Sequence, residues 1–118
     1  MSMVTLEEAK SYLRVYSDFE DDLIAGQILS AESLCMDVAR LPVDVWDEIA
    51  AYTETKRKTI TLRDEEKSKG EILQMKALCR AAVFYTLGYL YEHREEADHH
   101  DLVMTLRNIL FTIREGVF

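Results

Sequence analysis

EILQMKALCRAAVFYTLGYLYEHR, residues 71–94, contains the longest uncharged run of this chain, from Ala81 to Tyr91. Apolar side chains recur in it at helical spacing, and further apolar residues widen that face beyond a single stripe. A helix that is apolar over most of its circumference is covered by neighbours on several sides. The uncharged run is far shorter than the roughly 20 residues of a membrane span, and Lys76 and Arg80 precede it. We therefore expect the central helix of a small helical bundle, with no membrane partner.

The bulk composition predicts one intracellular domain, residues 1–118, that needs no cofactor to fold. A chain of 118 residues can bury a core of its own, and its 48% hydrophobic content is ordinary for a globular protein. One proline and four glycines favour long helices. The opening MSMVTLEEAK lacks the basic start and apolar run of a signal peptide. Cys35 and Cys79 sit among apolar helix positions, so we expect buried free thiols; a disulfide or a redox pair is the alternative.

The net charge of −8 argues against a protein with general affinity for nucleic acid. Residues 1–40 are strongly acidic, whereas residues 41–70 are nearly balanced and hold the only basic cluster, Lys56-Arg57-Lys58. Any contact with DNA would therefore be limited to this basic cluster.

Helix start and stop signals place three further helices around the central one. Thr5-Leu6-Glu7-Glu8 forms a capping box for a helix over about 5–14. The stretch from Ser17 to Glu20 repeats that pattern before a long amphipathic helix that runs to about Arg40, where Pro42 ends it. Asp98 or Asp101 can cap a final helix that stops at Gly116, before an apolar tail, Val117-Phe118. The prediction is an all-α fold of about four helices around residues 71–94.

The insert, residues 41–70, allows several interpretations. Asp44 can cap a brief helix that contains Trp46. Residues 59–62, TITL, alternate like a strand, so a small β-hairpin is possible, and a solvated loop is the alternative. Trp46 is open to two roles, a core residue or a contact for a partner. The tyrosines at 85, 89 and 91 are interpreted as core residues of the central helix.

One cluster, residues 92–101, has the composition of a metal site. His100-Asp101 matches the doublet of HD-class phosphohydrolases, and His93 and His99 lie nearby. Glu92, Glu95 and Glu96 have the spacing of a nucleotide pyrophosphohydrolase motif. However, HD-class enzymes draw ligands from separate helices, whereas all three histidines of this chain fall within residues 93–100. The pyrophosphohydrolase site would need a second acidic motif on the central helix, which is absent from the sequence. We interpret the cluster as a polar interhelical connection and expect no catalytic residue, metal or cofactor; the metal-dependent hydrolase remains the alternative, and a small helical regulator of a partner protein is a third possibility.

Three segments resemble the head–tail connector (DNA-packaging) proteins of long-tailed bacteriophages. The opening VTLEEAKSYLRV with the acidic DFEDDLI is similar to the start of that family, and ALCRAAVFYTLGYLYEHRE is similar to its apolar central helix. The closing LRNILFTIREGVF resembles its last helix and tail. The resemblance covers about 1–40 and 71–118 and leaves the insert unmatched.

The resemblance implies a non-enzymatic structural subunit of the virion, made in the bacterial host cytoplasm. Such subunits form a ring of about twelve copies beneath the portal protein, extend the DNA channel and carry the next connector or tail protein. DNA is then only passing cargo, which an acidic channel repels. Candidate interface residues lie in the insert and at the tail: Trp46, Lys56, Arg57, Lys58, Val117 and Phe118.

Overall fold

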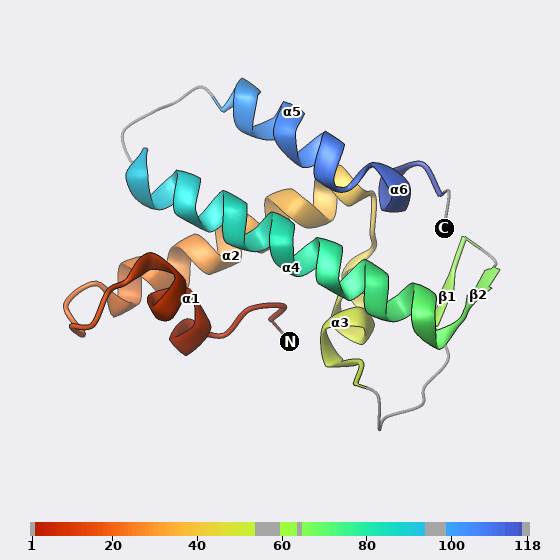
Figure 1. Cartoon of the computed structure of the whole chain (residues 1–118), viewed down its shortest axis with the longest axis horizontal. Coiled ribbons are helices and arrows are strands. Elements are labelled where there is room, and N and C mark those ends of the chain that lie inside the picture. Colours follow the sequence, from red (N-terminus) through yellow and green to blue (C-terminus); the bar gives the residue numbers. More distant parts are fainter. Residues whose placement is uncertain (1, 54–59, 64, 94–98, 117–118) are drawn as a thin grey trace.

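The computed structural model describes residues 2–53, 60–63, 65–93 and 99–116. Within these residues the chain forms six helices and two short strands (Figure 1). In chain order they are α1 (Leu6–Leu13), α2 (Asp21–Ala39), α3 (Val43–Ala51), β1 (Ile60–Leu62), β2 (Glu65–Lys67), α4 (Lys69–Glu92), α5 (His100–Ile109) and α6 (Phe111–Arg114). The prediction of a small helical protein is confirmed, with six helices where about four were expected. The insert, for which several interpretations were open, contains both a brief helix and a small hairpin.

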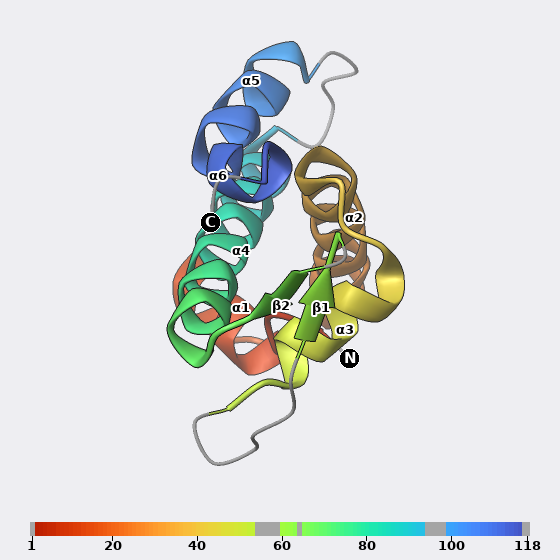
Figure 2. The same ribbon diagram turned by 90° about the vertical axis from the view of Figure 1, so that its right-hand side faces the viewer.

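α4 is the longest helix and packs against α1, α2, α3 and α5, as its broad apolar surface predicts. It begins two residues earlier than predicted because Ser68 and Glu71 form a capping box, in which each side chain accepts a hydrogen bond from the other residue's backbone N–H. Figure 2 shows α2 and α4 side by side, with α5 above them, α6 level with their upper ends, and α1 and α3 toward their lower ends. The tyrosines of α4 are less buried than predicted, since Tyr85 is exposed and Tyr89 and Tyr91 are only half-buried.

The predicted end of α2 near Arg40 is confirmed, whereas the capping pattern predicted at its start is wrong. The helix begins at Asp21 after Glu20, and no side chain caps it. The carboxylate of Asp18, which the sequence pattern assigned to the start of the helix, instead accepts a hydrogen bond from Lys10. The helix also ends before Pro42, because Arg40 adopts a left-handed conformation with φ of 57°. The capping box of Thr5 and Glu8 at α1 is confirmed.

The insert is folded where the structure describes it. Pro42 precedes α3, so Asp44 lies inside the first turn instead of capping the helix. Strands β1 and β2 pair in antiparallel register, Ile60 opposite Lys67 and Leu62 opposite Glu65. Because Ile60, Leu62 and Lys67 are buried, a solvated loop is wrong for the residues of the hairpin. The basic cluster at 56–58 lies outside the described residues.

The predicted final helix is divided into two helices, because the helix is interrupted at the buried Leu110. His99 precedes α5, and Asp101 lies in the first turn without capping it; Asp98 lies outside the described residues. Gly116, with φ of +71°, follows α6 as predicted. Arg63 of the hairpin donates to the carbonyl oxygens of Ile113 and Arg114, at 2.8 and 3.3 Å, and so satisfies carbonyls at the end of α6.

Cys35 and Cys79 are free and buried in the core, as predicted. Burial raises the pKa of the Cys35 thiol to about 11 and that of Cys79 to about 12. Neither is therefore a reactive thiol near neutral pH. No helix among the described residues is both long enough and apolar enough to cross a bilayer.

Candidate interaction surfaces

The loop between α1 and α2, residues 14–20, presents two aromatic side chains to solvent. Tyr16 is 87% exposed and Phe19 is 97% exposed. We call this segment the Phe19 loop. Covering a phenylalanine side chain that is exposed to water gains about 2 kcal/mol of burial free energy, so Phe19 is a candidate contact for another molecule.

The Phe19 loop is held in place on both sides of Phe19. The ammonium group of Lys10 pairs with Asp18 at 3.0 Å and with Asp21 at 2.8 Å, one carboxylate on each side of Phe19. Glu20 accepts a hydrogen bond of 2.6 Å from the hydroxyl of Tyr91 on α4. These side-chain contacts hold the loop in the conformation in which Phe19 is exposed.

Two further exposed apolar residues, on two different elements, lie beyond the other end of α2. Val43 starts α3, four residues after the end of α2, and Phe111 starts α6; both are exposed. α6 sits at this end because Arg114 donates to the carbonyl oxygen of Val38 at 3.1 Å. We call Val43 and Phe111 the distal pair. At 1.5 Å per residue, the 19-residue helix that separates it from the Phe19 loop is about 28 Å long.

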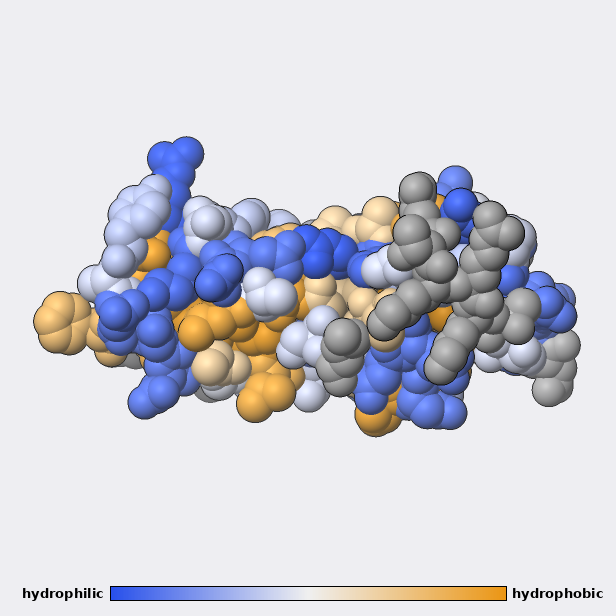
Figure 3. All heavy atoms as spheres, turned by 90° about the horizontal axis from the view of Figure 1, so that it is seen from below, coloured by the Kyte–Doolittle hydropathy of each residue, from blue (hydrophilic) through white to orange (hydrophobic). Residues whose placement is uncertain are grey.

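A third apolar area lies on the underside of the molecule. Figure 3 shows apolar side chains gathered there, with hydrophilic side chains around them. An apolar centre with a polar rim is the usual composition of a protein–protein contact.

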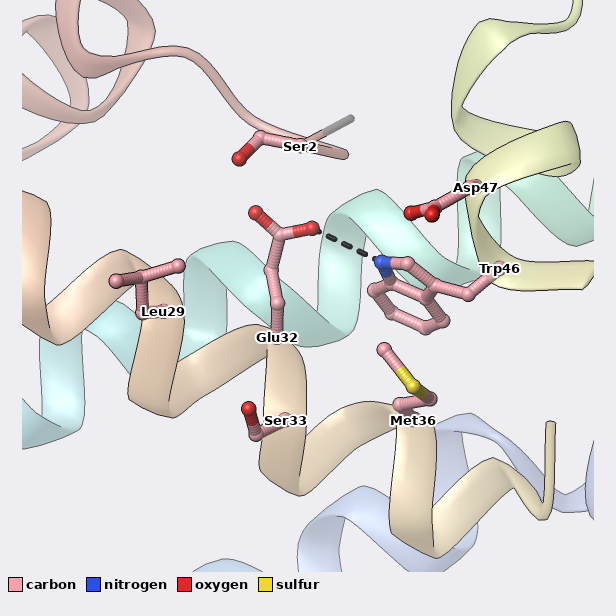
Figure 4. A pocket seen from close by; sticks show the side chains of 7 residues that line it. All are labelled: Ser2, Leu29, Glu32, Ser33, Met36, Trp46 and Asp47. Atoms are coloured by element: carbon pink, nitrogen blue, oxygen red, sulfur yellow. Dashed lines mark hydrogen bonds between the residues drawn. The ribbon is translucent and has the colours of Figure 1, made fainter. Parts of the chain in front are cut away.

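A pocket of about 280 Å³ opens beside Leu29, between the N-terminal segment, α2 and α3 (Figure 4). Glu32, only 6% exposed, lies in it. Its Oε1 accepts from the backbone N–H of Met3 at 2.7 Å and from the indole Nε1–H of Trp46 at 2.9 Å. Its Oε2 is buried and has no hydrogen-bond partner among the described residues. The pocket is lined by Ser2, Leu29, Glu32, Ser33, Met36, Trp46 and Asp47.

Trp46, a candidate interface residue in the sequence, is a core residue. Its side chain is buried, and its one polar atom is satisfied by Glu32. Of the two roles that the sequence left open, the structure supports the core. Its partner Glu32 was missed, although a signal existed: Glu32 lies four residues after Ile28 and three before Cys35, on the inner face of an amphipathic helix.

The residues of the predicted metal alternative are spread over two helix ends. His93 ends α4 and stacks on Tyr89, with ring centroids 4.4 Å apart, and His99 meets the same ring edge-on at 5.7 Å. His100 and Asp101 are exposed at the start of α5. In the described part of the chain, which leaves out residues 94–98, no three His, Cys, Asp or Glu side chains could hold one metal ion.

The remaining interface candidates, Lys56, Arg57, Lys58, Val117 and Phe118, lie outside the described residues. The Phe19 loop was not among the predicted sites. Its signal was a single phenylalanine inside the acidic run from Asp18 to Asp22, where an apolar side chain has no helical face to join.

Compared with protein-family models, with curated proteins and with solved structures, the chain gave no significant match.

Proposed function

We propose that this chain is a structural subunit of a phage head–tail connector. It assembles into a ring of about twelve copies beneath the portal protein, within the virion at the head–tail junction. The observation that carries the proposal is the 97% exposure of Phe19 on a loop fixed by Lys10 and Tyr91. The three sequence segments that resemble connector proteins supply the class of assembly.

A ring requires two different surfaces on each subunit. In a head-to-tail contact one surface of a copy meets another surface of the next, and the ring closes if the rotation per step allows it. The Phe19 loop and the distal pair of Val43 and Phe111 lie at opposite ends of α2. In the proposed ring, the Phe19 loop of each copy packs against the distal pair of its neighbour.

The charge of the chain suits a protein around a DNA channel. A net charge of −8 repels the phosphate backbone, so DNA passes as cargo without binding tightly. The contacts between subunits leave the two faces of the ring exposed. One face would meet the portal protein, and the other would meet the next connector or tail protein.

Mass photometry and sedimentation velocity of the purified chain test the assembly. We expect a ring-sized species that Phe19→Ser removes, because the side chain is exposed in the monomer and contributes only to the contact. Met104→Ser is the matched control, since Met104 is an exposed apolar residue of α5 outside both surfaces. A wild-type chain that stays monomeric up to its solubility limit would contradict self-assembly.

Mixing two variants tests the polarity of the contact. Phe19→Ser leaves the distal pair intact, and Phe111→Ser leaves the Phe19 loop intact. In a head-to-tail contact the two variants together form a dimer with one functional interface and no larger species. If Phe19 instead packed against Phe19 of a neighbour, mixing would restore nothing, and the head-to-tail ring would be wrong.

A further inference from the structure

The residue that ends α2 has an unfavourable backbone conformation for its type. Arg40 is left-handed, with φ of 57°, and the N–H groups of Arg40 and Leu41 donate to the carbonyl oxygens of Asp37 and Met36, each at 3.1 Å. Helices that end in this way favour glycine, because the Cβ of any other residue is crowded there. Keeping an arginine at this position therefore costs free energy of folding.

Contacts of the Arg40 side chain do not offset that cost within one chain. Arg40 is exposed, and its guanidinium forms no hydrogen bond or ion pair with the described residues, Asp37 and Asp44 included. Arg63 shows the contrast, since it also has a positive φ, of 51°, but its guanidinium donates to two carbonyl oxygens at the end of α6. A strained residue whose side chain is unused in the fold points to a contact with another molecule.

Arg40 belongs to the same end of the molecule as the distal pair. It lies three positions before Val43, in the short connection between α2 and α3. α6, which carries Phe111, is attached to this end of α2 by the hydrogen bond from Arg114 to Val38. Exposed apolar side chains together with an arginine are a common composition of protein–protein contacts.

The Phe19 loop offers the opposite charge. Lys10 pairs with two of the four carboxylates in residues 18–22, and the hydroxyl of Tyr91 donates to a third. The fourth, Asp22, is exposed and has no hydrogen bond or ion pair with the described residues. Asp22 lies three positions after Phe19, in the first turn of α2. Each surface therefore has exposed apolar side chains and an unused charged group, and the two charges are opposite.

We infer that Arg40 of each copy pairs with Asp22 of the next copy in the head-to-tail contact. Asp22 and Arg40 are separated by about 27 Å along α2, so they cannot meet within one chain. A contact that joins opposite ends of α2 in two copies brings them together, and the guanidinium then donates to the carboxylate. This pairing rests on the proposed ring, and it adds a charged pair that selects which ends meet.

Charge reversal in two separate variants of the full chain tests the pairing. Arg40→Glu gives a chain with negative charge at both positions, and Asp22→Arg gives a chain with positive charge at both. Alone, each variant opposes like charges in every contact, so we expect assembly about tenfold weaker or more by mass photometry. In a 1:1 mixture every contact again joins opposite charges when the two variants alternate. We expect ring-sized species that contain both variants in equal amounts by native mass spectrometry.

The matched control is Lys69→Glu, which makes the same change of charge as Arg40→Glu. Lys69 is exposed at the start of α4, outside both surfaces. We expect Lys69→Glu to assemble as the wild-type chain does, because its charge faces no carboxylate of a neighbour in the proposed contact. Loss of assembly in this variant would show that net charge, and no particular pair, controls the ring.

Thermal unfolding of Arg40→Gly separates folding from assembly. The dipole of α2 favours a positive charge at this end, whereas the left-handed backbone favours glycine. At concentrations where the chain is monomeric, we expect the Tm of Arg40→Gly to rise by about 2–5 °C. Its assembly should weaken about threefold or more, since the pair is lost. A lower Tm would assign Arg40 to folding and remove the reason for the pairing.

The remaining outcomes separate the pairing from the ring. If Phe19→Ser prevents assembly but both charge reversals assemble normally, the ring stands and the pairing is wrong. If the mixture of reversed variants stays as dispersed as each variant alone, the pairing is also wrong. A mixture that stops at dimers would place Arg40 and Asp22 in a closed two-fold contact and exclude the head-to-tail pairing. A wild-type chain without rings overturns the proposed function, and the pairing with it.

Discussion

Arg80 of α4 and Glu8 of α1, 72 positions apart in the sequence, form an ion pair. Nη1 of the same guanidinium donates to the carbonyl oxygen of Met3 at 2.7 Å, and the group lies 5.5 Å from the centre of the Phe84 ring. Arg80 therefore joins the N-terminal segment to the central helix. It also holds Met3 at the position from which its N–H reaches Glu32.

The Glu8–Arg80 pair should make folding stability depend on acid pH. The hydrogen bond from Arg80, with the one from the Thr5 backbone, lowers the pKa of Glu8 from 4.5 to about 2. Because the pKa is lower in the folded protein, ionised Glu8 stabilises the fold at pH values above 4.5. That contribution is lost as the pH falls from 4.5 through about 2. Since the Glu8 side chain is 38% exposed, solvent screening limits the effect to roughly 1 kcal/mol.

Glu8→Gln tests this by urea denaturation at several pH values. We expect a loss of roughly 1 kcal/mol near neutral pH that shrinks toward zero at about pH 2. The control is Glu7→Gln, an exposed residue of the same turn. A Glu8→Gln deficit that stays constant across the range would show that the charge of Glu8 is not involved.

Gly26 and Gly88 are a matched pair of helical glycines. A Cβ at Gly26 would meet nothing within 4 Å, so Gly26→Ala should stabilise the protein by about 0.5–1 kcal/mol through helix propensity. A Cβ at Gly88 would lie 3.3 Å from the ring of Tyr12. Because Tyr12 must move, Gly88→Ala should gain less. Thermal unfolding of both variants measures the difference, and an equal gain would mean that the Tyr12 ring yields freely.

The two thiols should be inert in the native protein. With a thiol pKa of about 11 for Cys35 and about 12 for Cys79, the thiolate fraction at pH 8 is at most about one in a thousand. Ellman's reagent should therefore label neither residue faster than the protein unfolds, and should label both in denaturant. Rapid labelling of the native chain would contradict the burial of these side chains.

Leu106 and Met104 compare the two faces of α5. Leu106 is fully buried, so Leu106→Ala should destabilise the protein by about 2–5 kcal/mol through lost burial and a new cavity. Met104 is exposed, so Met104→Ala should change the free energy of unfolding by about 0.5 kcal/mol or less. Denaturant titration measures both. Similar costs would mean that α5 is rotated about its axis.

The sequence predicted the helical elements because their signals are local. The uncharged run of α4 and the capping box at Thr5 depend on neighbours a few positions away. Local patterns failed where a distant group decides the conformation. Asp18 looked like part of a helix start, yet Lys10 takes its carboxylate, and a continuous final helix was predicted where Leu110 turns into the core.

The interaction surfaces were harder to predict for the same reason. Glu32 lies on the apolar face of α2, but only the fold brings the Met3 N–H and Trp46 to its carboxylate. Phe19 stood out in an acidic run, but its exposure depends on Lys10 and Tyr91, which are 9 positions before it and 72 after it. Composition identifies such residues as unusual, and tertiary contacts determine what they do.

α6 depends on two arginines for its position, Arg63 from the hairpin and its own Arg114. A four-residue helix is not stable in isolation, because the conformational entropy lost by fixing its backbone exceeds the stabilisation from its few hydrogen bonds. α6 therefore becomes ordered only after the hairpin and α2 have docked. We expect α6 to be among the first elements to unfold locally. Hydrogen exchange of its amides should then give an opening free energy that is smaller than the free energy of global unfolding.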